Sequence, residues 1–306
     1  MTDAEIKASS LGQNQGVRAN RRGGDGMRRP LMKMWCLLIA VAITAFAAWW
    51  LVDQPKRRGK AIATTKRVGG FVQLDGEYQP KSATPPFLRR GLARWSDKWL
   101  GPEFAHDLSV VSLDGQPISD DDLMSFERVA RLRRLYLNGT PITDAGMAHL
   151  ADLSELEILE LRETKIGDAA LHHLARMTQL RALYLYETQV DDAGMASLAR
   201  LRNLDELSLG HTAVGDAGLV HLAGLTKLKV LKLGKTRVTD AGLLHLAGLK
   251  KLEFLDLAQT DVTDEGLAHL SGLTELRLLF VDGTKVTAAG QAALQRTLPS
   301  LQICSD

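Results

Sequence analysis

Residues 231–254 read LKLGKTRVTDAGLLHLAGLKKLEF, and this pattern returns every 24 residues through the second half of the 306-residue chain. Its marker is a pair of leucines separated by one residue, found at Leu135/Leu137, Leu159/Leu161, Leu183/Leu185, Leu207/Leu209, Leu231/Leu233 and Leu255/Leu257. A seventh copy follows at Leu279/Val281, and a weaker one precedes at Val111/Leu113. A fixed period of this length predicts structural units that stack side by side.

Each unit contains one short strand and one short helix. Leu183 and Leu185 alternate with other residues, which predicts a strand with one buried face. Leu198 and Leu201, which follow Met195, predict the buried side of a helix. Parallel strands lie about 4.8 Å apart but packed helices need about 8–10 Å, so the stack must bend. We therefore expect an α/β solenoid with a parallel sheet on its concave face and short helices on its convex face.

The units resemble the leucine-rich repeat family, whose Leu-x-x-Leu-x-Leu spacing they share. The segment Val-Thr-Asp-Ala-Gly-Leu at 238–243 is similar to repeats of bacterial membrane-anchored members. The units also resemble the cysteine-containing subclass, with Thr where that subclass has Cys. The resemblance covers about residues 105–306 and implies the solenoid fold. It does not imply a ligand, because fold does not determine function.

Two polar positions recur from unit to unit. We expect the threonine hydroxyls to bond the backbone of the adjacent turn, and each aspartate to cap the start of its own helix. A calcium site is the alternative for the aspartates, but the chain has no Asp-x-Asp-x-Asp-Gly loop. These positions are Thr140, Thr164, Thr188, Thr212, Thr236, Thr260 and Thr284, and Asp144, Asp168, Asp192, Asp216, Asp240 and Asp264.

A column of histidines recurs on the helical side of the units. A metal site is one interpretation, but the Cys or carboxylate ligands of a typical site do not accompany these residues. We interpret them as partly exposed helix residues, and we expect no metal and no cofactor. The column consists of His149, His173, His221, His245 and His269.

An uncharged run of 19 residues, Met34 to Val52, precedes the repeats. As a helix it would be about 28 Å long, close to the ~30 Å hydrocarbon core of a bilayer. Tryptophans stand at both ends, as in interfacial aromatic belts. The alternative is a cleaved signal peptide, since Ala45-Phe46-Ala47 has the small-x-small form, but the apolar run continues beyond it. We therefore predict a single transmembrane helix that contacts the lipid bilayer.

The orientation of this helix is less constrained by the sequence. Six Lys or Arg residues lie near each end of the run, so the positive-inside rule gives a tie. A single anchor near the N-terminus usually translocates the large domain that comes after it. This favours a cytoplasmic N-terminus and an extracytoplasmic repeat domain.

The net charge differs in sign between the segment before the repeats and the repeats themselves. Residues 1–100 carry 18 Lys/Arg and 7 Asp/Glu, whereas residues 101–306 carry 20 and 29. A basic first third beside an acidic solenoid fits an anionic lipid surface and argues against nucleic-acid binding by the repeats.

Before the repeats, residues 56–68 are expected to form a short helix that ends at Gly69-Gly70, followed by a brief strand over 71–74. Residues 87–107 have apolar residues at helical spacing and are expected to cap the solenoid, or alternatively to lie on the lipid surface. The expected division is 1–33 disordered basic tail, 34–52 transmembrane helix, 53–86 juxtamembrane segment and linker, 87–107 cap helix, and 108–306 repeat domain of about eight repeats, with a C-terminal cap from about 291.

Side chains between the buried leucines should point to the concave face, because side chains alternate along a strand. These positions vary while the scaffold positions are constant, which leaves room for recognition. Aromatic and charged residues gather in the first half, and Val230, Phe254, Leu278 and Phe280 form an apolar patch near the end. The alternative is that Tyr and Phe are simply good strand residues. The candidate binding residues are Tyr136, Asn138, Glu160, Arg162, Tyr184, Tyr186, Lys232, Phe254, Asp256 and Phe280.

No catalytic motif accompanies this face. The chain contains no GxxxxGK[ST], GxSxG, HExxH or Cys-x-x-Cys, and its two cysteines form no metal or disulfide pattern. We therefore expect a membrane-anchored, non-catalytic scaffold that binds a protein partner. The alternatives are a regulatory or adaptor subunit of an enzyme complex, which the cysteine-containing subclass suggests, and an envelope structural protein that binds glycan.

Overall fold

The computed structural model describes residues 53–54, 56–75 and 107–305, all within one compact unit that begins at Asp53. The expected tail, the apolar run 34–52 and residues 76–106, which include most of the expected cap helix 87–107, lie outside the described residues. Within the described part of the chain, no helix is both long enough and apolar enough to cross a bilayer.

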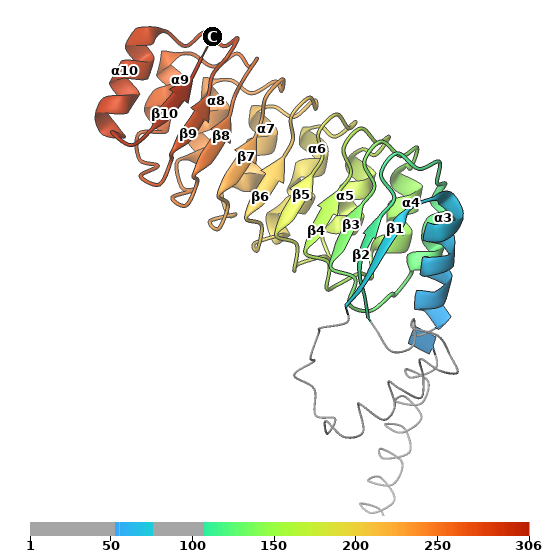
Figure 1. Ribbon diagram of the computed structural model, residues 1–306. Helices are drawn as coiled ribbons and strands as arrows, with labels where there is room; N and C mark the ends of the chain where they lie inside the picture. Colours follow the sequence, from blue (N-terminus) through green and yellow to red (C-terminus); the bar gives the residue numbers. More distant parts are fainter. Residues whose placement is uncertain (1–52, 55, 76–106, 306) are drawn as a thin grey trace, which may run out of the picture. The chain divides into compact units, whose positions relative to one another are not determined.

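The described strands form one sheet in which sequence order is also spatial order (Figure 1). The first pair is antiparallel and every later pair is parallel. Figure 1 shows the helices on the opposite side from the viewer, so the expected α/β solenoid is confirmed. The strands are β1 Phe71–Asp75, β2 Asp107–Ser112, β3 Arg134–Tyr136, β4 Ile158–Glu160, β5 Ala182–Tyr184, β6 Glu206–Ser208, β7 Val230–Lys232, β8 Phe254–Asp256, β9 Leu278–Phe280 and β10 Gln302–Cys304.

The helices are short, and several change from α to 3-10 geometry after one turn. Leu219, Leu222 and Leu225 are three residues apart and fully buried, and a 3-10 helix with three residues per turn keeps such positions on one side. The helices are α3 Asp120–Leu123, η2 Met124–Phe126, α4 Asp144–Leu150, α5 Asp168–Leu174, α6 Asp192–Met195, η3 Ala196–Arg200, α7 Asp216–Leu219, η4 Val220–Leu222, α8 Asp240–Leu243, η5 Leu244–Leu246, α9 Asp264–His269 and α10 Ala288–Thr297.

The threonine column behaves as expected. Each hydroxyl donates to the backbone carbonyl three residues earlier in its own turn, for example Thr236 Oγ1 to the Leu233 oxygen at 2.6 Å. The same bond recurs in the other repeats at 2.6–2.8 Å. Six of these threonines are buried, so the bond satisfies a hydroxyl that water does not reach.

The aspartate column corrects our expectation. The residue before each aspartate is the N-cap, and the aspartate is the first residue of the helix. Its carboxylate accepts a backbone N–H from the next repeat rather than from its own helix; Asp240 Oδ1, for example, lies 2.7 Å from the Thr263 nitrogen. This bond recurs along the solenoid at 2.6–2.9 Å. The aspartates therefore join neighbouring repeats.

At most joints, the glycine two residues after an aspartate makes room for the carboxylate of the preceding repeat; after Asp168 this position is Ala170. A Cβ at Gly218 would lie 2.6 Å from Asp192 Oδ1, the oxygen that accepts the N–H groups of Gly215 and Gly218 at 2.7 and 2.9 Å. It would also lie 2.9 Å from the Met195 side chain. The Asp-Ala-Gly part of the repeat is thus a joint between repeats.

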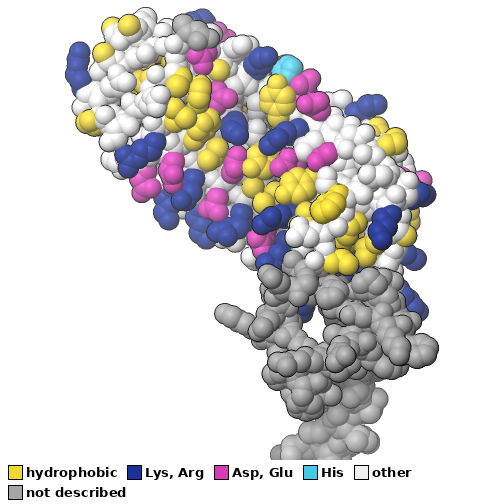
Figure 2. Space-filling model, viewed as in Figure 1, with side chains coloured by type: hydrophobic (Ala, Val, Ile, Leu, Met, Phe, Trp, Pro, Cys, Tyr) yellow, Lys and Arg dark blue, Asp and Glu magenta, His cyan; other side chains and the backbone are white. Residues whose placement is uncertain are grey.

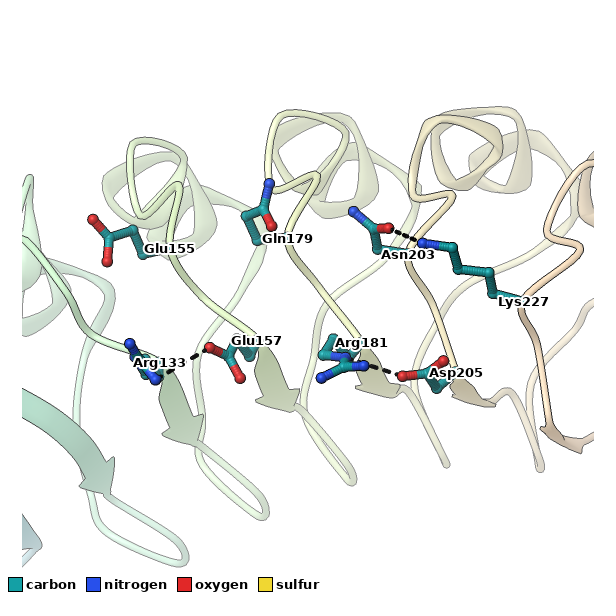
Figure 3. A pocket seen from close by; sticks show the side chains of 8 residues that line it. All are labelled: Arg133, Glu155, Glu157, Gln179, Arg181, Asn203, Asp205 and Lys227. Atoms are coloured by element: carbon teal, nitrogen blue, oxygen red, sulfur yellow. Dashed lines mark hydrogen bonds and ion pairs between the residues drawn. The ribbon is translucent and has the colours of Figure 1, made fainter. Parts of the chain in front are cut away.

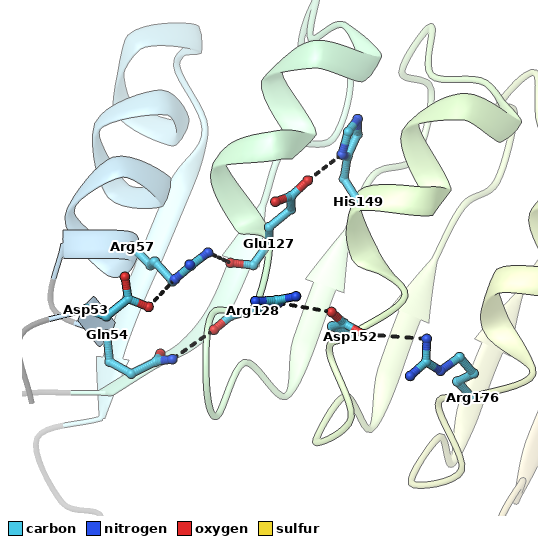
Figure 4. A network of polar contacts seen from close by, with 8 residues as sticks. All are labelled: Asp53, Gln54, Arg57, Glu127, Arg128, His149, Asp152 and Arg176. Carbon is cyan, nitrogen blue, oxygen red and sulfur yellow. Dashed lines mark hydrogen bonds and ion pairs between the residues drawn. The ribbon is translucent and has the colours of Figure 1, made fainter. Parts of the chain in front are cut away.

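The helix over 53–54 and 56–68 packs on the first repeat and is followed by β1, as expected for 56–68 and 71–74 (Figures 1 and 4). Gln54 is almost fully buried; its amide donates to the Arg128 oxygen at 3.1 Å and accepts from the Ala130 nitrogen at 3.0 Å. Arg57 bonds Asp53 and the Glu127 carbonyl. In the described chain, residues 53–75 therefore cover the start of the solenoid.

If the bond between repeats needs the space beside the glycine, one added methyl group should lower the stability of the protein. We expect Gly218→Ala to lower the free energy of unfolding by about 1–3 kcal/mol, because the added Cβ displaces the Asp192 carboxylate from two N–H groups. Gly224→Ala is the matched control, since its Cβ would meet nothing within 4 Å. Urea unfolding of both variants measures the difference. Equal losses in the two variants would show that the joint does not depend on this space.

One joint contains two carboxylates. Asp191 occupies the N-cap position where other repeats have Thr or Gly, and its nitrogen donates to Asp168 at 2.9 Å. Burial raises the pKa of Asp168 from its ordinary value of 3.8, and the Asp191 carboxylate raises it further, while backbone N–H groups oppose the shift. In the Thr-capped joints the hydroxyl instead donates to the aspartate, as from Thr239 to Asp216 at 2.6 Å.

We therefore expect Asp191→Thr to stabilise the protein at pH 7 by up to about 1 kcal/mol, because a repulsion is replaced by a hydrogen bond at a partly exposed site. The raised pKa makes folded Asp168 hold its proton more tightly than the unfolded chain, so stability falls as pH rises from 3.8 through the raised value. The gain should therefore shrink as pH is lowered through that window. Urea midpoints measured from about pH 7 to about pH 4 check this, and a gain independent of pH would contradict it.

Candidate functional site

The exposed face of the sheet, the expected concave face, is called the sheet face below. The strand register places one residue of each strand in a single column across the sheet. Within the repeats, the apolar residues on either side of this column are buried. All ten candidate residues are partly exposed on this face. Figure 2 shows hydrophobic side chains there, interleaved with side chains of both charges. The column is Phe71, Ser112, Tyr136, Glu160, Tyr184, Ser208, Lys232, Asp256, Phe280 and Cys304.

The candidate residues of the first half contact one another. Asn138 Nδ2 donates to Glu160 Oε2 at 2.8 Å and to Asp114 Oδ1 at 3.0 Å. The same Glu160 oxygen lies 3.6 Å from the Arg162 guanidinium, which stacks 4.4 Å from the centre of the Tyr184 ring. An arginine held by a carboxylate over an aromatic ring loses little further freedom on binding.

Tyr184 extends this group toward the later repeats. Burial raises the pKa of its phenol above the ordinary value, and a hydrogen bond to Glu206 raises it further. Glu206 also forms an ion pair with Lys232 at 3.4 Å.

The apolar candidates near the end join the same path. The Lys232 ammonium lies 5.8 Å from the centre of the Phe254 ring, and the rings of Phe254 and Phe280 are 5.4 Å apart and tilted by 40°. This tilted geometry is favourable for aromatic pairs. The two patches expected from the sequence are thus one continuous path, the sheet-face path: Asn138, Glu160, Arg162, Tyr184, Glu206, Lys232, Phe254 and Phe280.

Three candidates stand beside this path. Tyr186 packs against His211, with ring centroids 5.8 Å apart, and leans over Gly210, whose missing side chain makes space for the ring. Asp256 accepts the Ala258 N–H at 2.9 Å, and burial raises the pKa of its carboxyl, as does the nearby Asp282. Tyr136 lies in the central column, partly exposed.

Two residues of the face were not among the candidates. Glu206 connects the two halves; the sequence pattern places it on this face but does not predict its contacts with Tyr184 and Lys232. Phe71 is 60% exposed and reaches the column because β1 pairs with β2, with Phe71 opposite Ser112. It lies outside the 24-residue pattern, so only the fold brings it beside the repeats.

A groove, called the strand-start groove below, lies along the edge where the strands begin (Figure 3). It is a groove of about 400 Å³, and charges of alternating sign follow one of its sides from repeat to repeat. Arg181 pairs with Asp205 at 3.0 Å and Arg133 with Glu157 at 3.6 Å, and Lys229 continues the row by pairing with Glu253 at 3.0 Å. Each of these ion pairs joins side chains of neighbouring repeats.

The structure offers no arrangement of metal ligands in the residues it describes, where no group of three or more His, Cys, Asp or Glu could hold an ion. His149 instead bonds the Glu127 carboxylate of the preceding repeat at 2.7 Å. The sheet-face path consists of aromatic rings, paired charges and hydrogen-bonding side chains.

Comparisons with known proteins agree with this architecture. A family model described as Leucine Rich repeat matches residues 200–223 and 248–271. A search of curated protein sequences gives no significant match. Among solved structures, internalin C2 from Listeria monocytogenes is similar with 23% identity and a TM-score of 0.54, over 71% of this chain and 92% of that protein.

Two further structures are similar at lower scores. The Leptospira interrogans LRR protein LIC12759 has 19% identity and a TM-score of 0.48, over 59% of this chain and 45% of that one. The LRR ectodomain of the Arabidopsis thaliana membrane receptor kinase GASSHO1/SCHENGEN3, in complex with CASPARIAN STRIP INTEGRITY FACTOR 2, has 18% identity and a TM-score of 0.49, over 65% of this chain and 24% of that one. The repeat matches and the fold together support a leucine-rich repeat protein, an α/β solenoid of that family.

Proposed function

We propose that this chain is a membrane-anchored, non-catalytic scaffold that binds a protein partner on its sheet face. Leucine-rich repeat domains generally mediate protein–protein interaction and are typically not enzymes. The observation that carries the proposal is the sheet-face path, in which partly exposed aromatic and charged side chains are already ordered by one another. Tyrosine and arginine are common anchors of protein interfaces, and preordered side chains reduce the entropy lost on binding.

The charges of the path favour a protein partner over a nucleic acid. Arg162 is paired with Glu160, and Lys232 with Glu206. A surface that binds phosphates needs cations free to neutralise them. Paired charges beside exposed rings instead suit a partner surface with apolar groups and charges of both signs.

The sheet-face path is tested by exchanging two of its charges. We expect Glu160→Arg with Arg162→Glu to weaken partner binding at least about tenfold, or ~1.4 kcal/mol, because the arginine stacked on Tyr184 is replaced by a carboxylate. The partner is first identified by cross-linking to the full-length chain, and its affinity for each variant is then measured by titration.

The control is the exchange Asp261→Lys with Lys285→Asp, which also preserves net charge. These residues form an exposed ion pair at 2.6 Å away from the sheet-face path. Binding should survive this exchange. If both exchanges leave the affinity unchanged, the partner binds elsewhere. Retention of the chain on isolated wall glycan, lost only in the sheet-face exchange, would favour a glycan ligand for the same face.

The bilayer part of the proposal rests on the uncharged run Met34–Val52. We expect the chain to stay with membranes after an alkaline wash, with its repeats on the extracytoplasmic side. A C-terminal tag should then be cleaved by protease once the outer barrier alone is opened. A tag protected until the membrane is lysed would place the repeats in the cytoplasm. Release of the chain by the wash would contradict the anchor.

A further inference from the structure

The helix over 53–54 and 56–68 packs one of its sides against the solenoid. It is called the cap helix below and differs from the cap helix expected over 87–107. Gln54, Ala61 and Thr65 are at most 3% exposed, and Gln54 bonds the backbone of the first repeat at Arg128 and Ala130. Their spacing places them on one side of an α-helix. The opposite side of the helix is therefore turned away from the core.

That opposite side is basic. Lys56, Lys60 and Arg67 are exposed and spaced so that they share one side of the helix, with Ala63 between them and Lys66 at its margin. We call these five residues the basic stripe. The only acidic residue of this helix is Asp53, which pairs with Arg57.

Most of the positive charge on the stripe lacks a partner within the solenoid. Arg67 bonds Asp122 of the first repeat. Lys56, Lys60 and Lys66 form no ion pair with any carboxylate in the described part of the chain. This differs from the sheet-face path and the strand-start groove, where cations and anions neutralise one another. A stripe with three such lysines fits a polyanionic surface.

The basic stripe follows the uncharged run closely in the sequence, which favours anionic lipid over other polyanions. Lys56 comes four residues after Val52, the last residue of the uncharged run. Lys56 to Lys66 extends over only about 15 Å of helix. Lysines close to a bilayer attract anionic headgroups, and the attraction fades beyond a Debye length of about 8–10 Å.

We propose that the basic stripe is a docking surface for anionic lipid headgroups, so that the cap helix lies along the bilayer while its other side holds the solenoid. The inference rests on the proposed membrane anchor and adds a contact that the anchor does not require. An acidic protein partner is the competing occupant of the stripe.

The test uses the full-length chain in lipid vesicles with or without phosphatidylglycerol. A nitroxide is attached after Ala63→Cys, in the centre of the stripe, with Cys36→Ser and Cys304→Ser removing the other thiols. A relaxation agent bound to lipid headgroups reports the proximity of the label to the surface. A second chain labelled after Ala268→Cys, an exposed helix position in a late repeat, is the control.

We expect relaxation at position 63 to be several-fold stronger in anionic vesicles and to be lost at high salt, with position 268 unaffected. Replacing Lys56, Lys60 and Lys66 by Gln should abolish the effect, because each lysine near an anionic surface strengthens the attraction roughly fivefold. Replacing the same three by Arg should retain it.

The outcomes separate the stripe from the anchor. Chain that stays with vesicles after an alkaline wash, but shows equal relaxation at 63 with and without anionic lipid, overturns the docking surface and leaves the anchor intact. Chain released by the wash overturns the anchor; salt-sensitive relaxation before the wash would then still support the stripe. Relaxation at 63 that is unchanged by the Gln replacements would also overturn the docking surface.

Discussion

The carboxylate at the start of the helices α3 to α9 accepts a backbone N–H from the next repeat, and the rest of the solenoid depends on this bond. Neighbouring repeats must stay close enough for it to form at 2.6–2.9 Å. The glycine two positions later permits that approach at most joints, and the same approach buries the leucines fully. One repeat alone would leave both the N–H group and the leucines exposed to water, so only the stack is stable.

Because leucine, threonine, aspartate and glycine meet these structural demands, the residues between the leucines are free to vary. The sheet brings them together at the spacing of neighbouring strands, so side chains from consecutive repeats become direct partners. Glu206 illustrates the effect: its carboxylate raises the pKa of the Tyr184 phenol on one side and pairs with Lys232 on the other. The side-chain network of the sheet face thus arises between repeats, while each repeat by itself supplies only one or two groups.

The sequence was sufficient for the solenoid because its period is regular and the buried positions are leucines. The threonine bonds also followed, since donor and acceptor lie in the same turn. The aspartate bonds did not, because donor and acceptor lie in different repeats and propensity rules describe only a residue's own helix. The sheet-face path was found as two patches for a similar reason: the contacts of Glu206 depend on side-chain direction. The sequence also did not predict the left-handed backbone at five turn positions, because this conformation is usually recognised by a glycine and none stands there. These positions are Glu163, Glu187, His211, Lys235 and Gln259.

The cap helix changes the interpretation of the segment that follows the apolar run. Residues 53–86 were expected to act as a juxtamembrane segment and linker, and a flexible linker of that length would let the repeats reach far from the surface. In the structure, Asp53 and Gln54 already belong to a helix whose buried amide bonds the first repeat. The described start of the segment expected to be a linker is therefore folded against the repeats.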